Sequence, residues 1–484
     1  MISIRQRLFK GAVWNAIAQF GSQGINFVVL IILARLLDPT DFGLVGMVTV
    51  FTIFLGYFSE CGLTPSLVQK KEADETDYNT VFWSTVVFAA AIYAFVFLCA
   101  PLIAAFYKNN SLTPLIRALF MSFLFSPFGF VPETMERKGL HYRRIALADL
   151  MSLTVSGSLA VSLALLGFGV WSLVWLEVVR VFSRSLCLMV LVRWRPKLIF
   201  SFGRLKALMR SGAHFTMANM ISYFESNTDF LIVGKFLGAE ALGIYSFAFR
   251  ISRYPFMKIW GIFGQMLFPA FVNFREDVDR IKRNFVKVSA FGGVVLMPLA
   301  LFLFFGMESL TRLLFGMKWF AIVPLVRTLV VYLLFDSVTM ADYSLMMVYN
   351  RIRIVNIIRI VGSVFLFGLG YAASIRFGVI GMAAVYTGIA LVDSVIVRCF
   401  VLRELKVGWG WSLMRLKPIG ALALVLIGFG SVFFVAFHDR LPDLLFLAVM
   451  ALALGLAAAI FLIKQRVVDL KNQTFRLDAL ADVA

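Results

Sequence analysis

Residues 81–106 read VFWSTVVFAAAIYAFVFLCAPLIAAF and contain no charged side chain. A helix needs about 20 apolar residues to cross the hydrocarbon core of a bilayer, so this stretch is long enough for one full crossing. It is also far longer than the strand of a membrane barrel, which crosses in about ten residues. The stretch therefore predicts a membrane-spanning α-helix.

The whole chain has the same apolar character. Of its 484 residues, 61% are hydrophobic and only 15% are charged, and the mean hydropathy is +0.89. Soluble domains carry about a quarter charged residues, so a soluble fold is excluded. The net charge of +19 would suggest nucleic-acid binding in a soluble protein. Here no polar segment is long enough to form a separate domain, and we expect no nucleic-acid partner.

Apolar stretches of comparable length recur from one end of the chain to the other. They predict fourteen spans: 12–36, 42–66, 81–106, 112–131, 146–166, 170–192, 212–237, 243–269, 286–306, 320–349, 354–374, 378–400, 418–437 and 441–463. The tenth is unusually long, which predicts a bend or a break within it. We therefore expect an all-α integral membrane protein with 14 transmembrane helices.

The basic residues indicate how these helices are oriented. Most of the 46 Lys and Arg residues fall in alternate connections, including the long ones at 193–211, 270–285 and 401–417. Because cytoplasmic loops carry an excess of Lys and Arg, both ends of the chain are predicted to be cytoplasmic. No connection is long enough to form a catalytic domain, as a polysaccharide polymerase or ligase would need on the outer face.

An internal repeat relates the first six spans to the next six. Gly11-Ala12 matches Gly212-Ala213, Gly43-Leu44 matches Gly243-Ile244, and Phe168-Gly169-Val170 matches Phe377-Gly378-Val379, in the same order. An even number of spans in each copy gives the two copies the same orientation, which is one of the arrangements that transporters use. We expect a six-helix lobe at 1–200, a second at 201–405, and two additional helices with a cytoplasmic tail at 406–484.

A stripe of amides follows one face of the first predicted helix. Asn15, Gln19, Gln23 and Asn26 are three or four residues apart, and amides can both donate to and accept from sugar hydroxyls. The stripe favours the lining of a polar cavity, while hydrogen bonding between packed helices is the alternative.

Charged side chains are concentrated in the seventh and eighth predicted spans. The acids Glu225 and Asp229 lie on one face, with Asn219 nearer the inner end. The cations of the eighth span are Arg250, Arg253 and Lys258. One interpretation is structural pairing between these acids and arginines, since buried charges are normally paired. The other is a cationic site for a substrate that carries phosphate, which arginine binds through two donors.

Further ionisable residues lie in other predicted spans. Arg180 and Arg184 belong to the sixth, where a local pair between Glu177 and Arg180 would leave Arg184 available for the cationic site. Asp336 and Asp393 are candidate coupling acids, together with Glu225 and Asp229. Coupling to H⁺ or Na⁺ would use such groups, although they are equally plausible partners for arginines.

The chemistry of an enzyme or of a metal site is not indicated. The four cysteines and three histidines are scattered, without the spacing of a metal site. There is no phosphate-binding loop for ATP and no nucleophile motif, so we expect no catalytic residue, no metal and no cofactor.

Four stretches resemble the polysaccharide transporters of the multidrug/oligosaccharidyl-lipid/polysaccharide (MOP) exporter superfamily, and the Wzx-type flippases in particular. They are ARLLDPTDFG (34–43), ERKGLHYRR (136–144) with Asp149, GFGVWSL (167–173), and GIY (243–245) with Arg250. The likeness extends over nearly the whole chain, but its motifs say little about the sugar.

The resemblance implies a flippase of the bacterial inner membrane. Its substrate would be an oligosaccharide unit on undecaprenyl diphosphate, moved from the cytoplasmic to the periplasmic leaflet by alternating access for O-antigen or exopolysaccharide assembly. Membrane lipids, a polysaccharide polymerase and the chain-length machinery would be partners. The alternative is an exporter of the same superfamily for another cargo, such as a drug or a different lipid-linked precursor.

Overall fold

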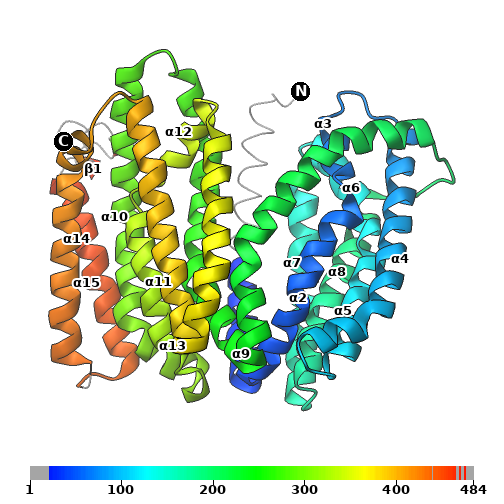
Figure 1. The fold of residues 1–484 in the computed structure, drawn as a ribbon, viewed down its shortest axis with the longest axis horizontal. Coiled ribbons are helices and arrows are strands. Elements are labelled where there is room, and N and C mark those ends of the chain that lie inside the picture. Colours follow the sequence, from blue (N-terminus) through cyan, green and yellow to red (C-terminus); the bar gives the residue numbers. More distant parts are fainter. Residues whose placement is uncertain (1–20, 439, 465–467, 470–473, 476–484) are drawn as a thin grey trace. The chain divides into compact units, whose positions relative to one another are not determined.

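The computed structural model describes residues 21–438, 440–464, 468–469 and 474–475, and these are almost entirely helical (Figure 1). Contacts within the chain divide it into two units, Met1–Gly243 and Ile244–Ala484. The predicted boundary between residues 200 and 201 falls within the first unit, just before a long helix that continues into the second. The predicted three-part division therefore remains a prediction.

The first unit begins with the apolar helix Gly21–Leu36. It continues with α2 (Pro39–Glu60), α3 (Leu63–Gln69), α4 (Glu75–Phe106), α5 (Leu112–Phe125), α6 (Pro127–Lys138), α7 (Tyr142–Leu165), α8 (Val170–Val192) and the first part of α9 (Phe202–Asn273). α7 packs along α8, and α4 packs along α5. Capping at Asp74 explains the start of α4: its carboxylate accepts the Asp77 N–H at 3.0 Å, while its own N–H donates to the Asp77 carboxylate.

The second unit contains the rest of α9 and the remaining helices. These are α10 (Val278–Leu310), the π-helical η1 (Thr311–Phe315), the 3₁₀ turn η2 (Met317–Trp319), α11 (Ile322–Asp336), α12 (Asp342–Val348), α13 (Ile352–Glu404), α14 (Trp409–Phe437) and α15 (Asp443–Lys464). Two short strands follow, β1 (Val468–Asp469) paired with β2 (Thr474–Phe475). The tenth predicted span is divided between α11 and α12, which confirms the predicted break.

Glycines with positive φ divide the two longest helices. Gly238 in α9 has φ 91°, and Gly378 in α13 has φ 62° and ψ −147°. Gly169, which the sequence repeat matches to Gly378, has φ 54° and ψ −129° at the start of α8. Side chains with a Cβ rarely adopt these backbone angles, so glycine is required at both matched turns. Each turn separates two of the predicted spans.

Seven of the described helices are long and apolar enough to cross a membrane, and the number is eight if α5 and α6, bent by 42°, form one broken span. Ser226–Met257 of α9 and the whole of α13 are each among the seven, and each extends across two predicted spans. The chain is thus an all-helical, multi-pass membrane protein. The count of 14 and the internal repeat remain predictions.

Close helix crossings in the first unit depend on glycine. A Cβ on Gly43 of α2 would overlap the carbonyl oxygen of Ala239, and a Cβ on Gly243 would overlap the carbonyl oxygen of Pro39. The same holds at Gly62, where a Cβ would overlap the carbonyl of Gly212. Membrane helices use small residues in this way, because close approach maximises packing where there is no hydrophobic driving force.

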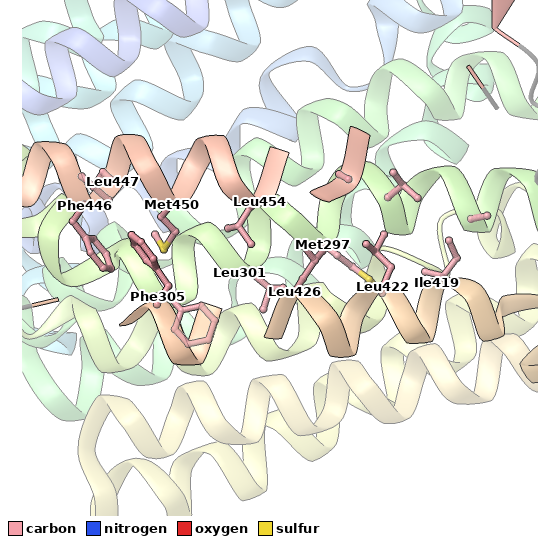
Figure 2. Packing of buried hydrophobic residues seen from close by; sticks show 14 residues of the cluster. Met297, Leu301, Phe305, Ile419, Leu422, Leu426, Phe446, Leu447, Met450 and Leu454 are labelled. Atoms are coloured by element: carbon pink, nitrogen blue, oxygen red, sulfur yellow. The ribbon is translucent and has the colours of Figure 1, made fainter. Parts of the chain in front are cut away.

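The last two helices pack onto α10 through one apolar cluster (Figure 2). Met297, Leu301 and Phe305 of α10 lie between side chains of α14 and α15. Those of α14 include Ile419, Leu422 and Leu426, and those of α15 include Phe446, Leu447, Met450 and Leu454. The pair α14–α15 is therefore an integral part of the second unit.

Candidate functional site

Arg184 of α8 links two acids from neighbouring helices in the first unit. Its Nη1 donates to Glu133 Oε2 on α6 at 2.8 Å, and its Nε donates to Asp149 Oδ1 on α7 at 2.6 Å. One guanidinium thus ties three helices together. Arg184, which the local pair of Glu177 and Arg180 was predicted to leave available, is thus paired with two acids distant in sequence.

The neighbouring Arg180 is paired as the spacing predicts. Its Nη2 donates to Glu177 Oε1 at 2.6 Å and its Nε donates to Glu177 Oε2 at 3.0 Å, one helical turn away. Glu133 also accepts from Arg137 at 2.7 Å. Arg137, Arg180 and Arg184 are therefore balanced by three carboxylates, and an anionic substrate would have to displace an acid to bind there.

The stretch 136–144 forms the turn between α6 and α7. Arg144 Nη1 donates to Glu136 Oε1 at 2.9 Å, and His141 Nδ1 lies 3.7 Å from the other carboxylate oxygen. Leu140 has φ 58°, the left-handed conformation that reverses the chain. The side chain of Glu136 is only 4% exposed, so this pair stabilises the turn. The motif is structural here, at least in its charged part.

A buried ion pair joins α12 to α13 in the second unit. Arg398 Nε donates to Asp342 Oδ2 at 2.8 Å, and both side chains are 3% exposed. Arg398 Nη2 also donates to the carbonyl of Val338 at 2.6 Å, and the guanidinium lies 4.8 Å from the ring centre of Phe285. Asp342 and Arg398 are 56 positions apart in the chain, and neither belongs to the site predicted from the sequence.

Arg253 of α9 lies beside aromatic rings. Its guanidinium carbon is 5.3 Å from the ring centre of Phe249 and 5.6 Å from that of Tyr386. Asp336 of α11 faces this arginine closely enough to feel its charge, and it accepts from Thr339 Oγ1 at 3.3 Å. Aromatic faces attract a guanidinium without neutralising it, so Arg253 keeps its charge and its donors.

Arg250 is exposed on the same part of α9. Within the part of the chain that the structure describes, neither Arg250 nor Arg253 forms an ion pair, whereas Arg180, Arg184 and Arg398 each do. The side chain of Glu225 lies outside the described residues, so the pairing of Arg250 and Arg253 with Glu225 and Asp229 stays a prediction.

The other predicted site residues have varied positions. Gln23 is half-buried and Asn26 exposed on the helix Gly21–Leu36, while Asn15 and Gln19 lie outside the described residues. Asn219 is exposed and Asp229 is buried, and the side chains of Glu225 and Lys258 also lie outside the description.

Asp393 fills the space that Gly362 leaves, since a Cβ there would approach its Oδ2 to 2.7 Å.

A further charged group at the end of α10 has no counterpart in the sequence predictions. Glu308 pairs with Arg312 at 2.5 Å and with Arg327 at 3.5 Å, and its Oε1 lies 3.3 Å from His438 Nε2. The ring of His438 stacks on Phe434 with centres 4.4 Å apart. In the sequence, the only sign of this charged group is the four-residue spacing between Glu308 and Arg312. These contacts fasten α11 and α14 to α10.

Within the described ranges, no group of three His, Cys, Asp or Glu residues is arranged to hold a metal ion. The four cysteines Cys61, Cys99, Cys187 and Cys399 are free thiols. The charged side chains therefore offer two kinds of chemistry: neutral clusters that bind helices together, and arginines able to bind an anion.

Comparisons with known proteins agree with this description. The family model described as "Polysaccharide biosynthesis protein" matches residues 32–324, more than half of the chain. The lipopolysaccharide biosynthesis protein WzxC of Escherichia coli is 29% identical over 360 residues, covering 72% of each chain. The teichuronic acid biosynthesis protein TuaB of Bacillus subtilis is 26% identical over 437 residues, covering 89% of this chain and 90% of its own.

Solved structures give the fold. The lipid II flippase MurJ in an inward closed conformation superposes with a TM-score of 0.74 at 13% identity, over 93% of this chain and 98% of its own. An inward-facing multidrug resistance MATE family transporter of the MOP superfamily gives a TM-score of 0.63 at 14% identity, over 82% and 98%. The chain therefore belongs to the polysaccharide biosynthesis protein family, as its resemblance to the Wzx-type flippases predicted, and it has the fold of the MOP-superfamily transporters.

Proposed function

We propose that the protein is a flippase that moves an oligosaccharide unit linked to undecaprenyl diphosphate from the cytoplasmic to the periplasmic leaflet of the bacterial inner membrane. The observation that carries the proposal is the contrast between the arginines. Arg250 and Arg253 form no ion pair among the described residues, although a charge within a span normally has a partner. A diphosphate would supply that partner.

Arg253 has the geometry that such a substrate needs. Its guanidinium lies over the rings of Phe249 and Tyr386, and contact with an aromatic ring does not neutralise its charge. Planar guanidinium donors match two phosphate oxygens at once, so Arg253 binds phosphate in a fixed orientation. Independently of Arg253, the amides Asn15, Gln19, Gln23 and Asn26 suit sugar hydroxyls, because an amide can both donate to and accept from them.

Asp336 gives this site a means of release. Its carboxylate is near enough to Arg253 for the two charges to interact, and a bound phosphate would compete with it for the guanidinium. Proton or Na⁺ binding at Asp336 would then neutralise the acid, and loss of the cation would return the arginine to it. Alternating access follows when binding at this site favours one orientation of the transporter over the other.

The test uses a strain that lacks the chromosomal gene and carries a plasmid copy. We expect deletion to accumulate the lipid-linked repeat units and to abolish surface polysaccharide. Arg250→Ala and Arg253→Ala should each lower export roughly tenfold or more, the cost of losing a charged hydrogen bond, while the protein still reaches the membrane. Arg376→Ala, which removes an exposed charge in the same unit, is the matched control.

The alternative cargo predicts a different phenotype. If the protein exports drugs or another lipid, deletion leaves surface polysaccharide and its lipid-linked precursors at wild-type levels. Normal polysaccharide in both arginine variants would contradict the cationic site even if the deletion phenotype is as expected. A polymerase and a chain-length regulator remain proposed partners, because the repeat units delivered outside must next be joined.

A further inference from the structure

A second site lies at the membrane edge of the first unit, on α4 and the connection between α8 and α9. A cavity of about 360 Å³ is lined there by Trp83, Ser84, Val87 and Phe88 of α4, by Leu198 and Phe200 of the connection, and by Leu205 at the start of α9. Six of these seven residues are apolar or aromatic, so the cavity suits a hydrocarbon chain.

Hydrogen bonds hold the connection between α8 and α9 against α4, so the walls of the cavity are fixed relative to each other. The Lys197 N–H donates to Asn79 Oδ1 at 2.6 Å and the Ser201 N–H donates to Thr80 Oγ1 at 3.1 Å. From the other side, Trp83 Nε1 donates to the Lys197 carbonyl at 2.8 Å. Asn79 and Thr80 are fully buried. Three side chains from about one turn of α4, Asn79, Thr80 and Trp83, thus hold the connection in place.

Around the cavity, large apolar side chains point away from the protein. Leu198 is 90% exposed and Phe202 is 72% exposed. In a multi-pass membrane protein, exposed apolar side chains of this size suit contact with lipid, and Trp83 and Trp194 are of the type that gathers at the level of the headgroups. These residues favour a position of the segment at the membrane interface, on the side that the basic connections predict to be cytoplasmic.

The same segment carries an excess of positive charge. Of its cations, Lys197 pairs with Glu75 at 2.7 Å, and Arg204 pairs with Asp74 at 2.5 Å and with Asp77 at 3.1 Å. The others form no ion pair within the described part of the chain: Arg193, Arg195, Lys206 and Arg210. Arg195 and Lys206 are close in sequence to Leu198 and Leu205, which line the cavity.

We propose that this is a binding site for one anionic phospholipid, with an acyl chain in the cavity and the headgroup phosphate at Arg195 and Lys206. The complementarity of charge selects an anionic lipid over a zwitterionic one. We assign the site to a membrane phospholipid and not to the transported lipid, because its cations are at the surface of one unit, whereas Arg250 and Arg253 lie within a span. The site is independent of the cargo proposed above.

The test uses purified full-length protein and a phosphatidylglycerol probe with a photoreactive group in the acyl chain. We expect crosslinks on peptides that contain residues 83–88 and 198–205, displaced by unlabelled phosphatidylglycerol but not by phosphatidylcholine. Val87→Trp fills the cavity and should abolish the labelling, while Leu98→Trp, at an exposed position of the same helix, should leave it unchanged.

A second experiment removes the positive charges proposed to bind the headgroup. Arg195→Gln and Lys206→Gln should each weaken displacement by phosphatidylglycerol about fivefold. Arg403→Gln, which removes an exposed charge in the other unit, should have no effect. Equal labelling by a phosphatidylcholine probe, equal effects of Val87→Trp and Leu98→Trp, or stronger displacement by undecaprenyl phosphate than by phosphatidylglycerol would each overturn the proposal. None of these outcomes depends on transport, so they are separable from failure of the flippase assignment.

Discussion

Gly43 and Gly243 lie in a reciprocal contact in which each occupies the space beside a carbonyl of the opposite helix. Gly43 faces the carbonyl of Ala239, and Gly243 faces that of Pro39. The two glycines also match in the sequence repeat, as do Pro39 and Ala239 by the same offset. The close approach of α2 and α9 at this point therefore requires that both residues lack a Cβ.

Gly43→Val should therefore prevent stable folding. The new side chain would overlap backbone atoms, which cannot turn aside as a flexible side chain can, so the cost should reach or exceed the ~1–3 kcal/mol typical of overpacking. Gly56→Ala is the control on the same helix, because nothing lies within 4 Å of a Cβ there. Size-exclusion chromatography after heating in detergent measures the difference. Wild-type stability of Gly43→Val would contradict the close crossing.

Breaking the pair Asp342–Arg398 should strongly destabilise the second unit. Asp342→Ala leaves a buried guanidinium without its carboxylate, at a cost of about 3–5 kcal/mol. Arg351→Ala removes an exposed partner of Glu404, and it should change stability by at most about 1 kcal/mol. Thermal stability in detergent compares the two variants. Equal effects would mean that the Asp342–Arg398 pair is not buried in the folded protein.

Arg184→Gln should affect folding more than substrate recognition. It leaves Glu133 and Asp149 facing each other with one fewer cation between α6, α7 and α8. We expect a lower apparent Tm, and rescue of part of it by the additional change Asp149→Asn. A variant with normal stability that fails to export would instead place Arg184 in the substrate site.

The start of α4 should lose stability in acid. The Asp77 backbone N–H and the Arg204 guanidinium lower the pKa of Asp74 to about 2 from its ordinary value of 3.8. The ionised form is thus favoured in the folded state, and the stabilisation is complete above about pH 4 and lost as the pH falls toward 2. Asp74→Ala should lower Tm at pH 7, and its difference from wild type should shrink below pH 4. A difference independent of pH would contradict this pairing.

The amide stripe of the first predicted helix should face water in at least one transport state. Cysteine at Gln23 or Asn26, in a protein without other cysteines, should react with a charged thiol reagent, as should cysteine at Asn15 or Gln19. Phe27→Cys, at a 48% exposed apolar position of the same helix, is the control that should remain protected by lipid. Complete protection of the amide positions would favour helix packing as their role.

Local sequence signals predicted much of this structure. The apolar stretch 81–106 forms most of α4, the long tenth span is broken between α11 and α12, and Glu177 pairs with Arg180 one turn away. Each of these features depends on residues that are neighbours in the chain. Helix periodicity and spacing are sufficient for such features.

Contacts between side chains of different helices could not be predicted from local spacing in the sequence. Arg184 meets acids 35 and 51 positions earlier in the chain, and Arg398 meets an acid 56 positions earlier. A charge in an apolar helix indicates that a partner exists, but only the packing of the helices selects it. For this reason Arg184 was expected to be available and Arg398 was overlooked. Arg253 shows the same limit, since the ring of Tyr386 comes from a helix far along the chain.

The packing of α14 and α15 onto α10 has a practical consequence for measurements of motion. Phe305 and Met297 interlock with both C-terminal helices, and Gly430 and Gly306 bring the backbones so near that a Cβ would meet Phe305 and Met450. Helices joined in this way must travel as one body. A fluorophore on α15 would therefore report the movement of α10, and distance changes recorded from the C-terminal end can be read as displacements of the second unit.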